Sequence, residues 1–422
     1  MPESVSDSSR SLADWLHWQQ TLHSKPIELG LARVRAVAER LNLLTPRALT
    51  VTVGGTNGKG SSSTLAAKIY QAAGYKVGLY TSPHLLDYNE RVQVNGVTAS
   101  DARLCAAFAD IEAARADIPL TYFEFGTLAA LWVFAHENVD VQVLEVGLGG
   151  RLDAVNIIDA DAAIVTSIGL DHVDFLGHDR EAIGFEKAGI FRAQRAAIVG
   201  DLAPPQSLLD HARAIGADLQ VIRQHFAVHP HGDGFDWENP GQQFKNLPLP
   251  GIAGEAQLRN AACVIAAVQA LQARAPVGMD ALCQALPALR LPGRCDQRGR
   301  WIFDVAHNRE AATVLADFLA QTPKVLTIGV LGMLHDKPQA QVIQTLSAQI
   351  DAWVLVSLPG ARGTAAAQLA AQMPRHARVR CCETMQQAMA EAEASAGEQG
   401  RIVVTGSFLT VAAALAEFRI AD

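Results

Sequence analysis

A glycine-rich segment with a lysine and hydroxyl side chains is the first part of the sequence that could do chemistry. It follows an apolar, β-branched run at 49–53, precedes a helical pattern at 61–73, and reads Gly54-Gly55-Thr56-Asn57-Gly58-Lys59-Gly60-Ser61-Ser62. Backbone N–H groups of a glycine turn, the positive end of a helix and a lysine together bind phosphate. The standard spacing G-x-x-x-x-G-K-[ST] is not met, because Gly60 displaces the hydroxyl residue to Ser61. An ordinary strand-to-helix turn is the alternative, but this order of elements favours nucleotide phosphate binding.

Polar side chains recur where other predicted strands end. Ser82 follows a strand at 75–81, Glu145 lies near the end of one at 139–146, and His172 follows one at 162–168. Because ligands gather at the carboxyl ends of parallel strands, we expect these side chains near the glycine segment. A buried carboxylate needs a partner, which a divalent cation or a salt bridge from Arg151 would supply. A lone histidine is more often structural, but this donor set favours Mg²⁺.

Three more positions carry charged or polar groups. Lys187 follows Glu186, and its immediate surroundings predict a solvated helix on which it pairs with Glu186 or Glu181. Asp304 and His307 follow a predicted strand at 301–305, and Arg294 lies where it could reach across a cleft. No spacing matches a Ser/His/Asp set, CxxC or HExxH. Phosphoryl transfer with Mg²⁺ is the chemistry that all these groups share.

Composition limits the class of protein. The 422 residues are 49% hydrophobic and 18% charged, which predicts a soluble globular protein of two or three domains. The net charge of −8 and the lack of a long basic run argue against nucleic acid or a membrane surface as partner. No apolar stretch is long enough to cross a bilayer, and the N-terminus does not resemble a signal peptide. Six scattered cysteines indicate reduced thiols in a cytoplasm.

Strand and helix patterns alternate along the chain and predict a doubly wound α/β fold. Helices are expected within 8–45, around a loop at 22–30, and at 100–115, 123–136 and 259–274, with a hairpin at 92–97 and strands up to 199. Residues 218–250 predict a small β excursion, and the pattern breaks near 286–293. We therefore expect two domains, 1–290 and 291–422. The second is a smaller, Rossmann-like α/β unit with strands at 301–305, 324–331, 352–358 and 401–405 and helices at 309–320, 338–349, 363–373 and 384–396.

The chain resembles the folylpolyglutamate synthases of the bacterial, bifunctional dihydrofolate synthase type, within the Mur ligase superfamily. The resemblance covers nearly the whole chain, and this superfamily uses the irregular glycine spacing. It rests on seven motifs in order: 55–61; Thr81-Ser82-Pro83-His84-Leu85 with Glu90-Arg91-Val92; 145–153; Leu170-Asp171-His172; Glu186-Lys187-Ala188-Gly189-Ile190; Pro292-Gly293-Arg294; and Asp304-Val305-Ala306-His307-Asn308.

The resemblance implies an ATP-binding P-loop domain like the central domain of Mur ligases, with pterin-binding loops, followed by a C-terminal α/β ligase domain. The implied activity is ATP-driven ligation of L-glutamate to dihydropteroate, giving dihydrofolate, and to reduced folates, giving polyglutamates. An acyl phosphate is the implied intermediate, and ADP and phosphate are released. ATP is a substrate, with two Mg²⁺ ions and a monovalent cation such as K⁺. The implied protein is a cytoplasmic monomer with no nucleic-acid or membrane partner.

The resemblance also assigns roles to individual residues. Lys187 corresponds to a lysine that is carbamylated in the family, which reverses the interpretation drawn from its neighbours alone. The implied catalytic residues are Lys59, Lys187, Asp304 and His307. The implied ATP-binding residues are Asn57, Gly58, Lys59, Gly60, Ser61, Ser62, Asn260, Arg294 and Asp304. The implied metal ligands are Ser82, Glu145 and His172, and the implied pterin-binding residues are Leu29, Gly30, Phe123, Asp153 and Ala154.

Two departures and three rival functions accompany this interpretation. Arg309 stands where the family commonly has proline, and Leu409 where it commonly has histidine. A cell-wall amino-acid ligase would usually carry an extra domain before the glycine segment, but only about 50 residues precede it. A P-loop kinase or ATPase would not need Arg294, Asp304 and His307. A nucleotide-gated binding protein without catalysis would not need the metal positions.

Overall fold

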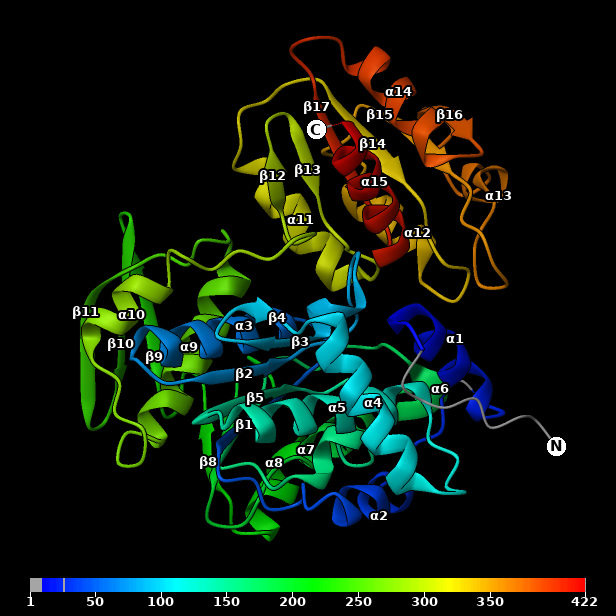
Figure 1. Ribbon diagram of the computed structural model, residues 1–422. Helices are drawn as coiled ribbons and strands as arrows, with labels where there is room; N and C mark the ends of the chain where they lie inside the picture. Colours follow the sequence, from blue (N-terminus) through cyan, green and yellow to red (C-terminus); the bar gives the residue numbers. More distant parts are fainter. Residues whose placement is uncertain (1–9, 26, 422) are drawn as a thin grey trace, which may run out of the picture. The chain divides into compact units, whose positions relative to one another are not determined.

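The computed structural model describes residues 10–25 and 27–421, so residue 26 of the predicted loop at 22–30 lies outside the described part. The chain divides into two compact units. One comprises Met1–Pro250 and Gln257–Leu289, and the other comprises Gly251–Ala256 and Arg290–Asp422. Each unit has its own main sheet, as the strands in Figure 1 show.

The first unit is organised around an eight-stranded sheet of the described chain, in the order β4-β3-β2-β5-β1-β6-β7-β8. From β2 to β8 neighbouring strands are parallel, and β3 and β4 add an antiparallel edge. The strands are β1 (Leu49–Gly54), β2 (Val77–Tyr80), β3 (Val92–Val94), β4 (Val97–Thr98), β5 (Val141–Glu145), β6 (Ala162–Val165), β7 (Ala196–Val199) and β8 (Asp218–Val221).

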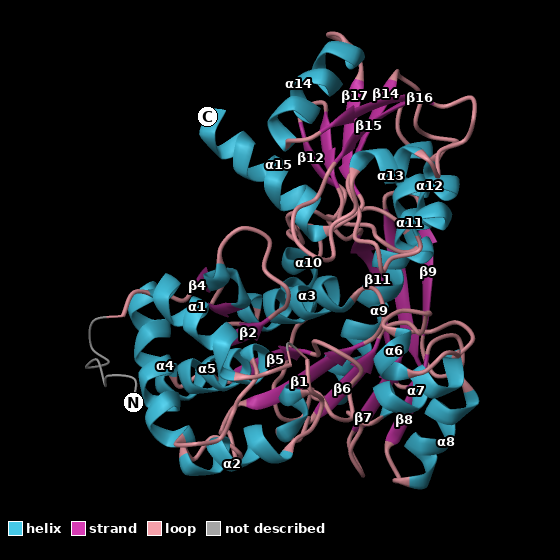
Figure 2. Ribbon diagram, turned by 90° about the vertical axis from the view of Figure 1, so that its right-hand side faces the viewer, coloured by secondary structure: helices cyan, strands magenta, loops and turns pink. Residues whose placement is uncertain are grey.

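Helices cover this sheet, as Figure 2 shows by colour. They are α1 (Leu12–Leu22), α2 (Ala32–Arg40), α3 (Lys59–Ala72), α4 (Asp101–Arg115), α5 (Tyr122–Glu137), α6 (Val173–Leu176), α7 (Arg180–Ala188), α8 (Gln206–Ala214), α9 (Glu255–Ala270) and α10 (Met279–Ala285). Helix α3 packs against β1, β2 and β5. Helix α5 lies close to β2, where a Cβ on Gly78 would be only 2.5 Å from the Phe134 ring. Glycine at that position therefore permits the close packing of helix on sheet.

The strand order brings the predicted site segments together at the carboxyl ends of neighbouring strands. In the order β2-β5-β1-β6 the strands are direct neighbours and all parallel. Glu145 at the end of β5 pairs in register with Val53, and Gly54 pairs with Val165 of β6. The glycine segment, Ser82 and the segment leading to His172 all follow these strands, as expected for a ligand site of a doubly wound sheet.

The prediction for 218–250 is partly wrong. Strand β8 joins the main sheet beside β7 and does not belong to the small β excursion. The rest of the segment forms a separate antiparallel sheet in the order β11-β10-β9. Its strands are β9 (Ala227–His231), β10 (Gly234–Asn239) and β11 (Gln242–Pro248).

The second unit contains a six-stranded sheet of the described chain, in the order β12-β13-β17-β14-β15-β16. All neighbours are parallel except β12, which runs antiparallel to β13. The strands are β12 (Asp296–Arg298), β13 (Trp301–Phe303), β14 (Thr327–Leu331), β15 (Ala352–Val356), β16 (Arg378–Cys382) and β17 (Arg401–Thr405). The helices are α11 (Arg309–Ala320), α12 (Gln339–Leu346), α13 (Ala366–Ala370), α14 (Met385–Ala396) and α15 (Phe408–Ala421).

Both units have the α/β architecture predicted from the alternating patterns, but three elements of the second unit were missed. Strands β12 and β16 lie at the two edges of the sheet and are largely exposed, with charged residues among them. Helix α15 is apolar over most of its length and has no helical periodicity to mark it. Among the described residues, no helix has both the length and the apolar character needed to cross a membrane.

Candidate active site

The glycine segment forms a tight turn between β1 and α3. Gly58 is the residue before the first turn of α3, with φ of +90°. A Cβ there would lie 2.7 Å from the Asn260 side chain, and one on Gly55 would lie 1.9 Å from Thr166 Oγ1. Glycine is therefore favoured at both positions, by the positive φ (+141° at Gly55) and by the close approach of a neighbouring side chain. The first turn of α3 includes Gly60 and Ser61, so backbone N–H groups and the helix dipole can face an anion there.

Residues that the sequence did not single out hold this turn in place. Thr166 Oγ1 donates to the Asn57 carbonyl at 2.6 Å, and the Asn57 N–H donates to Ser167 Oγ at 3.1 Å. Both hydroxyl residues follow β6, the neighbour of β1. The only sequence signal for them is their place at a strand end next to the glycine segment.

Two lysines converge on one backbone carbonyl. Lys59 Nζ donates to the Gly55 carbonyl at 3.0 Å, and Lys187 Nζ donates to the same oxygen at 3.0 Å. Lys187 is 4% exposed. Its burial, reinforced by the charge of Lys59, lowers the pKa of the Lys187 ammonium to about 7, although Asp171 and Asp153 act in the opposite direction.

The prediction that Lys187 pairs with a neighbouring glutamate on a solvated helix is wrong. Glu186 pairs with Arg151, whose Nη2 lies 2.7 Å from Glu186 Oε1. Glu181 accepts from the backbone N–H groups of Gln206 and Ser207. Lys187 instead points inward from α7 to the glycine segment.

Of the three predicted metal ligands, two are in direct contact. The backbone N–H of Ser82 donates to Glu145 Oε2 at 3.2 Å, and Glu145 is buried. The alternative partner for Glu145, Arg151, is the one engaged with Glu186. His172, with a left-handed backbone at φ of +51°, has a partly exposed ring that lies 3.9 Å from an Asp171 carboxylate oxygen.

This donor set fits a hard divalent cation. A carboxylate and a serine at adjacent strand ends supply the oxygen ligands that Mg²⁺ and Mn²⁺ prefer. Among the residues that the structure describes, no three His, Cys, Asp or Glu side chains cluster closely enough to hold a metal ion by themselves. Ser82 and ligand oxygens would therefore have to complete the coordination.

The predicted pterin residues lie on three segments of the first unit. Phe123 is in the first turn of α5, and its ring fills the space beside Gly147, where a Cβ would be 2.5 Å from Phe123 Cζ. Asp153 is buried and accepts from the N–H groups of Leu148 at 2.8 Å and Val155 at 3.1 Å. Burial outweighs these bonds and raises the pKa of the Asp153 carboxyl to about 6.

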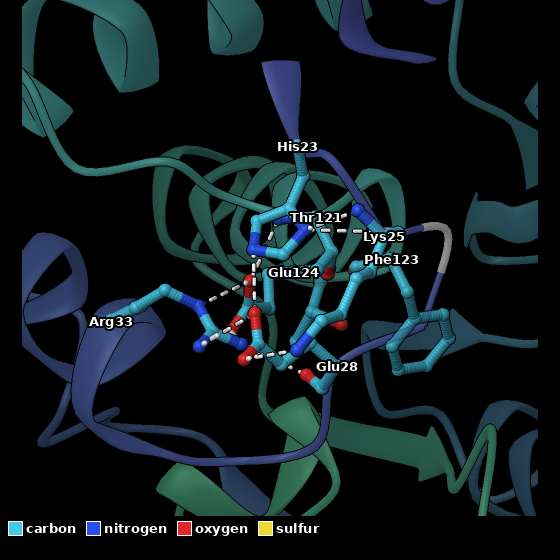
Figure 3. Close-up of polar contacts among 8 residues, drawn as sticks. His23, Lys25, Glu28, Arg33, Thr121, Phe123 and Glu124 are labelled. Atoms are coloured by element: carbon cyan, nitrogen blue, oxygen red, sulfur yellow. Dashed lines mark hydrogen bonds and ion pairs between the residues drawn. The ribbon is translucent and has the colours of Figure 1, made fainter. Parts of the chain in front are cut away.

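Backbone contacts connect two of these segments. The N–H of Gly30 donates to the Leu152 carbonyl at 3.2 Å, next to Asp153 and Ala154. Leu29 is half-buried, and Ala154 is buried. Figure 3 shows Phe123 at the start of α5 beside Glu124, which is bound to Arg33. Arg33, Glu28 and Glu124 were not predicted from the sequence.

The second unit has its own polar cluster at the end of β13. Asp304 is buried and accepts from the N–H groups of Cys295 and Ala306, both at 2.8 Å. Burial raises the pKa of the Asp304 carboxyl, while the charge of Arg294 opposes that shift. The Arg294 guanidinium carbon lies 5.1 Å from the centre of the Phe408 ring. His307 lies beside the same ring at 6.2 Å, so the cluster joins the three predicted residues of this unit.

The two departures from the family pattern lie at helix starts. Arg309 is the first residue of α11, and Asn308 caps this helix by accepting from the Ala311 N–H at 2.9 Å. Asparagine is among the best capping residues, so the helix start does not need proline. Leu409 lies in α15 with its side chain half exposed.

Comparison with known proteins gives a consistent assignment. Residues 53–268 match the model of the Mur ligase middle domain, and residues 289–408 match that of the Mur ligase, glutamate ligase domain. The dihydrofolate synthase/folylpolyglutamate synthase of Escherichia coli (strain K12) is 45% identical over 409 residues, which cover 95% of this chain and 94% of that protein.

Solved structures agree with these matches. The structure of E. coli FolC in complex with DHPP and ADP has a TM-score of 0.93 at 43% identity, covering 98% of this chain and 99% of that one. The bifunctional enzyme of Yersinia pestis complexed with AMPPNP and Mn ion has a TM-score of 0.92 at 43% identity, covering 99% and 100%. The chain therefore belongs to the dihydrofolate synthase/folylpolyglutamate synthase family of Mur ligases.

Proposed function

We propose that this protein is an ATP-dependent amide ligase that joins L-glutamate to dihydropteroate, forming dihydrofolate, and to reduced folates, forming polyglutamates. The observation that carries the proposal is the convergence of Lys59 and Lys187 on the glycine turn. The turn lies at the carboxyl ends of the strands, where Ser82 contacts Glu145. Such a site binds the phosphates of ATP and neutralises the charge that develops in phosphoryl transfer. The family assignment supports dihydropteroate and reduced folates as the acids, and L-glutamate as the amine, that the enzyme joins.

The reaction has two steps that balance. The carboxylate of the pterin substrate attacks the γ-phosphate of ATP, so that an acyl phosphate forms and ADP leaves. The amino group of L-glutamate then attacks the acyl carbon, an amide bond forms, phosphate leaves and the amine loses a proton. The protein positions the reactants and stabilises charge, as in other phosphoryl transfers.

The residues of the first unit divide this work. The glycine turn from Asn57 to Ser62, together with the side chain of Lys59 and with Asn260, binds the triphosphate. Ser82, Glu145 and His172 would hold Mg²⁺, which supplies charge neutralisation at the phosphates. The pterin is bound by Leu29, Gly30, Phe123, Asp153 and Ala154. Lys187 acts in its carbamylated form. Two Mg²⁺ ions and a monovalent cation such as K⁺ are part of this proposal.

The second unit contributes Arg294, Asp304 and His307. Arg294 and Asp304 bind the nucleotide, and His307 acts in catalysis. Residues 1–290 are then the ATP- and pterin-binding domain, and residues 291–422 are the ligase domain. We further propose a monomer working in a cytoplasm, which suits the unpaired cysteines of the described chain.

One assay tests the proposal. Purified protein is incubated with Mg-ATP, dihydropteroate and L-glutamate, and mass spectrometry follows dihydrofolate and longer glutamate chains. We expect both, with one ADP for each amide bond. If dihydrofolate forms but no longer glutamate chains appear, the polyglutamylation activity is removed from the proposal. ADP release without glutamate incorporation would favour an ATPase and overturn the proposal.

A further inference from the structure

A network of charged residues connects the loop before α2 to the start of α5. Its centre is Arg33, in the first turn of α2. Its other members are Glu124 on α5, and His23, Lys25 and Glu28 on the loop, and Figure 3 shows their side chains gathered around the guanidinium and the Glu28 carboxylate. None of these residues has a role in the proposed chemistry.

Glu124 is the fixed point of the network. It is 4% exposed and completes the capping box of α5, in which its Oε2 accepts from the Thr121 N–H at 2.7 Å. The carboxylate also receives Arg33, with Nε 3.3 Å from Oε2 and Nη2 3.1 Å from Oε1. A buried carboxylate needs such a partner, so the charge of Glu124 pairs Arg33 with the residue next to Phe123.

The same guanidinium holds the loop. Arg33 Nη2 donates to the Glu28 backbone carbonyl at 2.8 Å, and Nη1 lies 3.6 Å from the Glu28 carboxylate. His23 engages the same carboxylate oxygen, with its Nε2 2.7 Å from Oε2. On the other side of the ring, His23 Nδ1 lies 3.1 Å from the Lys25 backbone nitrogen and 2.9 Å from the Lys25 carbonyl oxygen, so the imidazole connects Glu28 to the Lys25 backbone.

The loop is therefore fixed at two places, and both lie next to predicted pterin residues. Arg33 attaches Glu28 to the first turn of α5, which carries Phe123. Gly30 is attached to Leu152, which precedes Asp153. Leu29 lies between these two attachments.

We propose that Arg33 is a positioning residue for the pterin subsite: it fixes residues 27–30 against the start of α5 and so sets the place of Leu29 and Gly30 relative to Phe123. The proposal rests on the proposed function, because it assumes that this subsite binds the pterin. Arginine is needed because its planar fork serves the carboxylate and the backbone carbonyl at once, whereas the lysine ammonium is a point charge.

The test compares Arg33→Lys, Arg33→Gln and Glu28→Gln with the wild type and with Arg35→Gln. Arg35 is exposed on the same helix, and the structure describes no ion pair or side-chain hydrogen bond for it, so it is the matched control. Steady-state kinetics give KM for dihydropteroate, ATP and L-glutamate. Amide hydrogen exchange of residues 27–31 is followed in the protein without substrates.

We expect both Arg33 variants to raise KM for dihydropteroate about tenfold, which corresponds to one lost charged hydrogen bond. KM for ATP and kcat should stay within about twofold, since only ground-state positioning of the pterin is lost. Exchange of residues 27–31 should become faster in both, with a smaller change in Glu28→Gln and none in Arg35→Gln. Arg33→Lys keeps the charge beside Glu124, so it decides the matter where Arg33→Gln does not fold.

An Arg33→Lys protein with wild-type KM for dihydropteroate would overturn the inference. So would a variant in which kcat and all KM values change together, because that would be a general loss of structure. Failure of the proposed function is distinct: the wild type itself would then form no dihydrofolate, while exchange of residues 27–31 would still report whether Arg33 fixes the loop.

Discussion

Lys59 and Lys187 donate to the same carbonyl oxygen, that of Gly55, each at 3.0 Å. One lysine belongs to the glycine segment, and the other reaches it from α7, 132 positions beyond Gly55. Two ammonium groups so close together repel each other, and burial of Lys187 adds to the cost of its charge. A neutral amine would relieve both penalties, and a carbamate, which carries a negative charge, would replace the repulsion from Lys59 by attraction.

The first prediction concerns Lys187. A pKa of about 7 leaves a large fraction of the amine neutral at neutral pH, and only the neutral amine adds CO₂ to form a carbamate. We expect Lys187→Ala to lower ligase activity about a hundredfold, the upper range for loss of a group that supports a metal site. Activity assays would measure this, and labelled bicarbonate would give a carbamate signal that Lys187→Ala lacks. Lys68→Ala, on α3, is the control. Full activity in Lys187→Ala would exclude the carbamate role.

The second prediction separates backbone strain from close approach at Gly58. Gly58 and Gly74 lie just outside opposite ends of α3 with φ of +90° and +92°, but only at Gly58 would an added Cβ lie within 3 Å of a neighbour, the Asn260 side chain. Both Gly→Ala variants should lose about 1 kcal/mol of stability from the left-handed backbone. Only Gly58→Ala should also raise KM for ATP, by displacing Asn260 and the turn. Thermal unfolding and ATP titration measure the two effects, and equal ATP binding in both variants would contradict the prediction.

The elements that the sequence predicted well are those with local signals. The run at 49–53, the glycines after it and the helical pattern after them lie within about two dozen residues, and the structure has β1, the turn and α3 there. Strand-end positions of Ser82, Glu145 and Asp304 follow from the same kind of pattern. Strand β16 was missed because Arg378 and Arg380 are exposed at the edge of its sheet, where no apolar alternation is required.

The contacts that the sequence could not predict are those between distant positions. The neighbours of Lys187 suggested a solvated helix, because nothing local shows that Glu186 pairs with Arg151 instead. Arg33 and Glu124 are 91 positions apart, and each looks like an ordinary surface residue in its own segment. Burial of a charge depends on which partner the fold brings, and a single sequence carries no signal for that.

The third prediction concerns Arg294 in the second unit. Its guanidinium lies over the Phe408 ring at 5.1 Å and opposes the burial effect on Asp304. Arg294→Lys keeps the charge but stacks less well on the ring, and Arg294→Ala removes both the charge and the stacking. We therefore expect KM for ATP to be higher in the lysine variant than in the wild type, and highest, by about tenfold, in the alanine variant. Arg298→Ala is the control, since Arg298 lies over Phe303 and pairs with Asp296. An alanine variant with unchanged KM for ATP would remove Arg294 from the nucleotide site.

The fourth prediction follows from the pKa of Asp153, which burial raises to about 6. Asp153 therefore takes up a proton more readily in the folded protein than in the unfolded chain, where the pKa of an aspartate carboxyl is about 4. Between these two values the folded state binds more protons, so this group's contribution to stability decreases as pH rises from about 4 to about 6 and is constant above. Asp153→Asn should flatten that part of the stability–pH curve.

The same titration should appear in substrate binding. If the ionised Asp153 accepts hydrogen bonds from the pterin, KM for dihydropteroate rises as pH falls through about 6, because protonation removes an acceptor. Asp153→Asn should have a higher KM that no longer changes across that range. Asp159→Asn, at an exposed ion pair with Arg192, should keep the wild-type profile. Comparing the profiles cancels titration of the substrate itself, so an identical pH dependence in wild type and Asp153→Asn would show that the carboxyl does not bind the pterin.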